Sequence, residues 1–454
     1  MTKSYLKGNC NYKTIFTFLL ALISLIFSII LPINKILYII IIMINLIILT
    51  IFNNILFEKK INAYIYFSFF YLICFGLLYA YNAYNAYGNF FGMVSDDSFY
   101  FFRSLDLMNR INIGASSLFE YIASFLLKVI SIFINLNELS VIYLLPFSYT
   151  FISLGIESMN HLYNMYHNKS LPLKYYFLFI ILNQNILSNC IPFYREAYAI
   201  FLFLLGIYYV QNNNRIKLFI TTILLFNIRG AFALILISFY ILKIIYKRKY
   251  KSMYIIGFIL TFFLAYALFD YIGPYLSFSG SSNYSENLLD TRLSLRTEGM
   301  SYSLTLLYSN PVFRILYFFL VPTNFIELHG MYEVIQHTST WTSISYIIEM
   351  TNWTAILNWI TVIILPCTIP RIVMGIINAT KSKNRNISVF GIFMIYSWIL
   401  IAIFSMQVRH FTILFILFPI FYGFWNRTKT KLLIKVCNII TLLLYIVVLT
   451  LNIL

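Results

Sequence analysis

Long apolar runs recur along this sequence, and they constrain its fold more than any other feature. The runs near 14–31 and 36–57 each reach or exceed the roughly 18 apolar residues that mark a membrane-spanning helix. Comparable runs follow as far as 433–453, and the chain is 61% hydrophobic with only 10% charged residues. A soluble core could not bury this much apolar surface. The sequence therefore predicts an all-α polytopic integral membrane protein.

The basic residues set the orientation of the predicted spans. Lys3, Lys7 and Lys13 precede the first run, so the N-terminus is expected in the cytoplasm. The formal charge of +17 is spread over short loops and forms no separate polar domain, so no nucleic-acid partner is expected. We predict about 13 transmembrane helices within a single transmembrane domain, 1–454.

The segment 118–136 decides which loops face which side. Its apolar residues repeat at helical spacing, but Glu120 and Lys128 interrupt them. As a span, it would place the later basic loops on a mixture of sides. As an amphipathic helix on the outer surface, it brings all of them into the cytoplasm. We therefore expect two long extracytoplasmic loops, 81–140 and 271–352, that carry surface or re-entrant helices.

Two arginines interrupt the apolar runs in the middle of the chain. Arg195 stands at a break, and Arg229 with Gly230 divides two short runs, 217–228 and 231–246. These runs are shorter than the roughly 17 to 25 residues of a normal span. We expect a tight helical pair whose outer elbow contains Arg229, where Gly230 would tolerate a positive φ. Ionisable groups near a bilayer are costly, which makes both arginines candidates for function.

The predicted outer face is rich in arginine, although the positive-inside rule depletes that face of basic residues. The planar guanidinium matches phosphate oxygens bidentately, so a lipid-linked diphosphate is the expected ligand. Binding of membrane-lipid headgroups, or a local ion pair with a neighbouring carboxylate, stays open as an alternative. The candidate diphosphate-binding residues are Arg195, Arg229, Arg292, Arg296, Arg314 and Arg409.

Four acidic or imidazole side chains on the same face are candidate general bases. Such a group would remove a proton from a sugar hydroxyl as the hydroxyl attacks an anomeric carbon, while arginines stabilise the departing diphosphate. The adjacent aspartates could instead hold a metal or cap a helix, and the histidine could bond a backbone carbonyl. The candidate catalytic residues are Asp96, Asp97, Glu196 and His410.

No motif indicates a cofactor or a metal. The sequence has no GxGxxG, P-loop or HExxH pattern, which disfavours an ATP-driven pump and an intramembrane zinc protease. The five cysteines are scattered and form no CxxC pair. His161 and His167 lie on the predicted cytoplasmic side and are therefore left out of the site.

The order of these features resembles that of the Wzy-type O-antigen and capsule polysaccharide polymerases, including their EpsG-like relatives. The resemblance rests on an acidic and aromatic early loop (95–100) and on Glu120, which opens the amphipathic helix. It also rests on the arginine-containing break (194–197), the polar elbow (227–230) and a late arginine and aliphatic segment (409–419).

The resemblance implies an inverting, metal-independent glycosyltransferase at the outer face of the bacterial inner (plasma) membrane. The growing glycan would move from undecaprenyl diphosphate onto a lipid-linked repeat unit, in the synthesis of O-antigen for lipopolysaccharide or of capsule. The resemblance also implies a GT-C-like architecture, no cofactor, undecaprenyl-diphosphate-linked oligosaccharides as substrates and a Wzz-type chain-length regulator as a partner.

Three alternatives stay open. A GT-C glycosyltransferase that uses a lipid-monophosphate sugar would have Asp96 and Asp97 as its site. An O-antigen ligase would share the layout and differ mainly in its acceptor. A lipid-linked oligosaccharide flippase or another transporter would usually show internal repeats and charges at mid-membrane depth, and this sequence shows neither.

Overall fold

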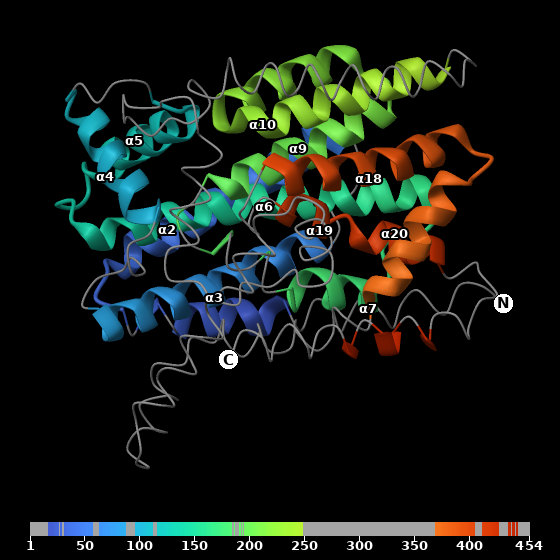
Figure 1. The fold of residues 1–454 in the computed structure, drawn as a ribbon. Coiled ribbons are helices and arrows are strands. Elements are labelled where there is room, and N and C mark those ends of the chain that lie inside the picture. Colours follow the sequence, from blue (N-terminus) through green and yellow to red (C-terminus); the bar gives the residue numbers. More distant parts are fainter. Residues whose placement is uncertain are drawn as a thin grey trace, which may run out of the picture. The chain divides into compact units, whose positions relative to one another are not determined.

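The described part of the chain is α-helical (Figure 1) and contains no β-strand. Among these residues, three helices are long and apolar enough to cross a membrane by length and composition: α2 (Lys35–Phe57), α6 (Val141–His167) and α10 (Arg215–Lys247). These observations confirm an all-α protein with membrane-spanning character, whereas the count of 13 spans stays a prediction. The computed structural model describes residues 17–26, 28–29, 31–57, 63–87, 96–111, 116–183, 186, 190–191, 193, 195–247, 368–404, 411–425, 435–436, 438–440 and 442–443.

The chain divides into two compact units, and three helices contribute residues to both of them. These helices are α6, α9 (Glu196–Gln211) and α10. The first unit comprises Met1–His161, Leu187–Leu205 and Ile223–Ile228, and the second comprises Leu162–Ile186, Gly206–Thr222 and Arg229–Leu454.

In the first unit, buried polar side chains join α2 to α6. Asn34 precedes α2 and accepts a hydrogen bond from the Leu37 N–H through its side chain, while its own N–H donates to the Tyr143 hydroxyl at 2.6 Å. Deeper along α2, the buried Thr150 hydroxyl donates to Asn45 Oδ1 at 2.8 Å. Interhelical hydrogen bonds of this kind fix the packing of helices that lipid surrounds, because lipid supplies no hydrophobic drive for helix association.

The helix α3 (Ala63–Tyr87) extends seven residues past the predicted end of its span near residue 80. Its Gly76 lies so close to α6 that a Cβ there would come within 1.9 Å of the Tyr149 hydroxyl oxygen. The missing side chain lets Tyr149 pass α3 and donate a hydrogen bond to the Ile191 carbonyl at 2.7 Å. This bond holds the segment that leads to Arg195.

Two short helices, α4 (Asp96–Met108) and α5 (Leu118–Ile130), pack against each other (Figure 1). Thirteen residues make a helix of about 20 Å, too short for a hydrocarbon core of about 30 Å. One face of α5 is buried, while Phe125 on the other is 66% exposed. The predicted short amphipathic helix is therefore present, and it ends at Ile130 instead of residue 136.

Helix α10 folds back on itself at Arg229, whose backbone is extended (φ −154°, ψ 91°). Lys243 Nζ donates to the carbonyl of Gln211 at 3.1 Å, although Gln211 lies only four residues before the helix begins at Arg215. In a straight helix, Lys243 would be about 42 Å from Arg215, far beyond that reach. The predicted helical pair around an elbow is thus confirmed. Arg229 itself makes the bend, and Gly230 is already helical.

Helix α6 continues nine residues beyond the predicted end of its span at residue 158. His161 and His167 belong to this longer helix and are buried, so the predicted end of the span is wrong. Their predicted place on the cytoplasmic side stays a prediction. In the second unit, His167 Nε2 is hydrogen-bonded to the Ile420 carbonyl at 3.0 Å.

The predicted span 175–190 is not one regular helix. The chain forms α7 (Leu173–Tyr176), continues as a π-helical turn over Phe177–Ile181 and leaves helical geometry at Leu182. A π-helical turn interrupts the usual hydrogen-bond pattern and is frequent where a helix is bent or functional.

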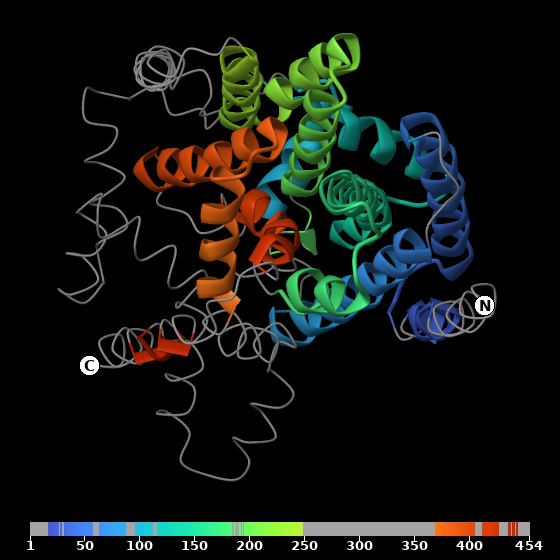
Figure 2. The same ribbon diagram turned by 90° about the vertical axis from the view of Figure 1, so that its right-hand side faces the viewer.

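Around Phe390, described aromatic residues of the second unit form a core. Phe390 belongs to α18 (Arg385–Phe404) and stacks on Phe421 at 5.0 Å and on Tyr166 at 4.8 Å. Figures 1 and 2 show that the helix formed by residues 368–380 lies at a steep angle to α18. The remaining helices of this region are α19 (Thr412–Phe415) and α20 (Phe418–Trp425).

Candidate functional site

An arginine of α4 and a glutamate of α5 form the ion pair that joins these two helices. Arg103 Nε donates to Glu120 Oε1 at 2.7 Å, and the glutamate side chain is only 4% exposed. The other carboxylate oxygen accepts hydrogen bonds from the Ser117 N–H at 2.6 Å and the Ser117 hydroxyl at 3.2 Å. Both carboxylate oxygens of Glu120 are therefore occupied. Glu120 fixes α5 against α4 and is poorly placed to act as a base.

Arg195 lies one residue before α9 and is held by an aromatic ring. Its guanidinium carbon is 5.4 Å from the centre of the Tyr100 ring, which belongs to α4. Its Nε is buried and has no hydrogen-bond partner among the residues that the structure describes. A buried donor without a partner is costly. The arrangement presents a cation that can accept an anionic ligand.

The aromatic residues beneath Arg195 come from three separate segments of the first unit. Tyr100 packs edge-on against Phe119 of α5, with ring centres 5.4 Å apart. Phe119 is fully buried and also contacts Phe193 at 5.0 Å and Tyr198 of α9 at 5.2 Å. This cluster fixes the ring on which the guanidinium rests, so that the position of Arg195 depends on α4, α5 and α9 together.

Glu196 is the first residue of α9 and is 2% exposed. A carboxylate in the first turn is favourable, because it lies near the positive end of the helix dipole. The predicted local pair of Arg195 with Glu196 is not among the ion pairs that the structure describes.

Asp96 and Asp97 are the first two residues of α4. Carboxylates at the start of a helix favour its formation through the helix dipole, which agrees with the helix-capping alternative drawn from the sequence. Their role as catalytic bases stays a prediction.

Arg229 belongs to the second unit, where it occupies the bend of α10. Its guanidinium carbon lies 5.1 Å from the centre of the Phe232 ring, and the residue is 9% exposed. Arg229 has extended backbone angles between two helical segments of α10, so it does not follow the helical side-chain spacing. The other sequence-predicted site residues, Arg292, Arg296, Arg314, Arg409 and His410, lie outside the described residues.

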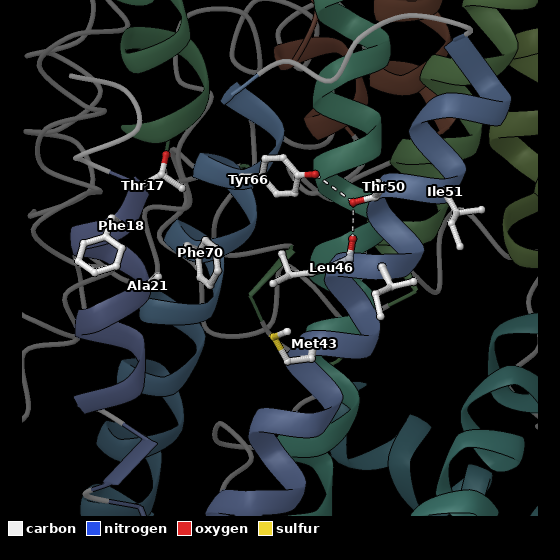
Figure 3. Close-up of a pocket in the computed structure, with 10 residues that line it drawn as sticks. Thr17, Phe18, Ala21, Met43, Leu46, Thr50, Ile51, Tyr66 and Phe70 are labelled. Atoms are coloured by element: carbon white, nitrogen blue, oxygen red, sulfur yellow. Dashed lines mark hydrogen bonds between the residues drawn. The ribbon is translucent and has the colours of Figure 1, made fainter. Parts of the chain in front are cut away.

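An apolar groove lies between the helix Thr17–Ile26, α2 and α3 (Figure 3), and its volume is about 550 Å³. On its wall, the Thr50 hydroxyl donates to the Leu46 carbonyl at 2.7 Å and is hydrogen-bonded to the Tyr66 hydroxyl at 2.9 Å. None of its lining residues is a carboxylate, a histidine or a cation, so the groove suits a hydrocarbon chain and not acid–base chemistry. The lining residues are Thr17, Phe18, Ala21, Met43, Leu46, Ile47, Thr50, Ile51, Tyr66 and Phe70.

Sequence reasoning identified Arg195 but missed its surroundings. Arg103 and Glu120 are 17 residues apart and Tyr100 is far from Arg195 in sequence, so no local pattern could pair them. The Ser117-x-x-Glu120 spacing is, however, a recognisable capping box and could have located the start of α5.

Among the described residues, no group of three or more histidine, cysteine or carboxylate side chains could hold a metal ion. Comparisons with models of protein families, with curated proteins and with solved structures found no match to this chain.

Proposed function

We propose that this chain is a polysaccharide polymerase of the bacterial inner membrane. It would transfer a growing glycan from undecaprenyl diphosphate onto a lipid-linked repeat unit at the outer face. The proposal includes a GT-C-like arrangement of about 13 spans with a cytoplasmic N-terminus. It rests on the sequence resemblance and on one structural observation, the Arg195 guanidinium.

The support from Arg195 is chemical. The guanidinium lies over Tyr100 and its buried Nε has no partner among the described residues. A pre-positioned cation of this kind stabilises negative charge that develops on a leaving group, and it costs no reorganisation during the reaction. Arginine is well suited to a diphosphate, because its fork can donate two parallel hydrogen bonds to phosphate oxygens.

The reaction would be a single displacement at the anomeric carbon. The hydroxyl oxygen of the acceptor sugar forms a bond to that carbon as the bond from the carbon to the diphosphate oxygen breaks. Undecaprenyl diphosphate leaves with the bonding electrons. A carboxylate or imidazole accepts the hydroxyl proton, and the candidates are Asp96, Asp97, Glu196 and His410.

A complementation experiment tests the proposal. A deletion strain would receive the wild-type gene, Arg195→Gln or Arg215→Gln, and its surface polysaccharide would be separated on a gel. Arg215 is an exposed arginine at the start of α10 and serves as the matched control. We expect a ladder from the wild type and the control, and a single repeat unit from the deletion strain and from Arg195→Gln. Loss of one oxyanion-stabilising donor lowers such rates by about 100-fold.

Two outcomes would contradict the proposal. Loss of even the single-unit band in the deletion strain would place the protein earlier, as a flippase or an earlier glycosyltransferase. A full ladder from Arg195→Gln, with normal protein levels, would remove Arg195 from the transfer site.

A second candidate is a GT-C glycosyltransferase that uses a lipid-monophosphate sugar. The observation that favours it is the placement of Asp96 and Asp97 at the start of α4. The lipid that accumulates in the deletion strain separates the two functions. A polymerase defect accumulates the single repeat unit on a diphosphate lipid, whereas the alternative accumulates a monosaccharide on a lipid monophosphate.

A further inference from the structure

The second unit holds a row of aromatic rings with a cation at each end. Arg371 lies over Trp425, with 5.1 Å from its guanidinium carbon to the ring centre. The Trp425 ring lies 5.7 Å from Tyr422, which lies 5.0 Å from Tyr175. At the far end, Lys174 Nζ is 5.2 Å from the Tyr175 ring centre. These five residues, Arg371, Trp425, Tyr422, Tyr175 and Lys174, are called the aromatic row below.

Among the described residues, one hydrogen-bond donor of Arg371 has no partner. Its Nε is buried and has no hydrogen-bond partner within the described ranges of the chain. The described residues of the second unit, which flank the row, include no aspartate or glutamate. A buried donor on a cation is stabilised by an anion, and no described residue of the second unit supplies one to Arg371.

Close helix packing holds Arg371 in place. A Cβ at Gly375, one turn after Arg371, would lie 1.9 Å from the Phe421 carbonyl oxygen. The helix 368–380 therefore lies directly on α20, which carries Tyr422 and Trp425. At its other end, the Thr380 carbonyl accepts a hydrogen bond from the Ser388 hydroxyl at 2.7 Å.

The row has the composition of a membrane interface on the cytoplasmic side. Tyrosine and tryptophan concentrate where a helix leaves the hydrocarbon. The helix 368–380 crosses the apolar helix α18 steeply (Figures 1 and 2), as expected of a segment that lies along the membrane interface. The turn after this helix exposes Lys381, Lys383 and Arg385, and the positive-inside rule places such a turn in the cytoplasm.

We propose that the aromatic row is a binding site for a phosphate group, and specifically for the phosphodiester of an anionic phospholipid in the cytoplasmic leaflet. Arg371 donates to the phosphate oxygens from its place on Trp425, and Lys174 adds a second positive charge. The tyrosine and tryptophan rings lie beside the glycerol and the first acyl carbons. This site is distinct from the proposed transfer reaction and does not depend on it.

A lipid-binding measurement on the purified full-length protein tests this site. Native mass spectrometry would follow the binding of phosphatidylglycerol and of zwitterionic phosphatidylcholine to the wild type, Arg371→Gln and Arg385→Gln. We expect the wild type to bind phosphatidylglycerol about tenfold more tightly than phosphatidylcholine, and Arg371→Gln to lose most of that preference. Arg385→Gln removes an exposed arginine, and we expect it to keep the preference within about twofold.

Two further arms keep the test decisive. Trp425→Leu leaves Arg371 in place but removes the ring beneath it, and we expect about fivefold weaker binding of phosphatidylglycerol. This variant tests the site if Arg371→Gln does not fold.

Competition with inorganic phosphate at millimolar concentration separates the two sources of the ligand. No displacement supports the lipid, whereas full displacement overturns the lipid assignment in favour of soluble phosphate. Equal affinity of the wild type, Arg371→Gln and Trp425→Leu for phosphatidylglycerol would overturn the site itself.

Discussion

The two units of this protein satisfy their positive charges in different ways. In the first unit, Arg103 is bonded to the carboxylate of Glu120 at 2.7 Å. In the described part of the second unit there is no carboxylate, and cations contact aromatic rings or backbone carbonyls instead. The two units therefore differ in the chemistry that they can offer a ligand. The first unit has carboxylates that can take up protons, whereas the described second unit can attract anions without offering a carboxylate.

Within the first unit, Arg195 differs from Arg103. It lies on Tyr100 in the manner of the second unit's cations, although carboxylates are present in the same unit. Among the described residues, Arg195 has no acidic partner although the unit contains carboxylates, and this is the feature that most favours a ligand.

The largest expected effect concerns the ion pair of the first unit. Glu120→Ala leaves Arg103 partly buried without its carboxylate and removes the capping box of α5. We expect the free energy of unfolding to fall by about 4 kcal/mol, as measured by unfolding in mixed micelles. Glu120→Gln is the matched control, since glutamine preserves the capping box and should cost less. An alanine variant as stable as the wild type would show that the pair does not join α4 to α5.

A smaller effect is expected at the buried lysine of the second unit. Lys243 is 4% exposed and donates to the carbonyls of Val210 and Gln211 at the C-terminal end of α9. A cation is favourable at this end of the helix dipole. We expect Lys243→Met, which keeps the aliphatic stem, to lower the free energy of unfolding by about 2 kcal/mol.

The same variant sharpens the comparison between the units. Because Lys243 ties the second leg of α10 to α9, its loss should also increase amide hydrogen exchange at 208–211, whereas exchange in α5 should stay unchanged. If the variant increased amide exchange equally at 208–211 and in α5, the result would contradict a local role for this lysine.

The smallest effect is expected at the ring beneath Arg195. Tyr100→Leu removes the cation–π contact, which is worth about 1 kcal/mol where it is partly buried. We expect about fivefold slower polymerisation, measured as the rate of ladder growth at matched protein levels. Tyr100→Phe keeps the ring and should polymerise at nearly the wild-type rate. A leucine variant with the wild-type rate would show that the ring does not position the guanidinium.

The sequence was informative where local chemistry decides the structure. Apolar runs predicted the helices, and the position of Arg229 between two short runs predicted the fold-back of α10. The sequence misled at the end of α6, where the apolar run and the predicted span ended near residue 158. There the Asn160 amide donates to Glu157 Oε1 at 3.3 Å and His161 Nε2 lies 3.2 Å from the same oxygen. Because these side chains satisfy one another, the helix can continue while it is buried.

Long-range contacts were beyond prediction. Arg371 was not a candidate residue. It lies in the predicted apolar run near 353–376, and nothing near it in the sequence indicates its aromatic neighbour. Its place over Trp425 depends on the close approach of two helices at Gly375, which only the folded chain brings about.

The most direct test of the account is the binding of undecaprenyl diphosphate to the purified protein in nanodiscs, with undecaprenol as the uncharged reference. For the wild type and Arg215→Gln, we predict tight binding of the diphosphate that weakens as salt rises, and much weaker binding of undecaprenol. For Arg195→Gln, we predict at least tenfold weaker binding of the diphosphate and unchanged binding of undecaprenol. Equal diphosphate affinity in the wild type and Arg195→Gln would contradict the claim that Arg195 is the anion site of this protein.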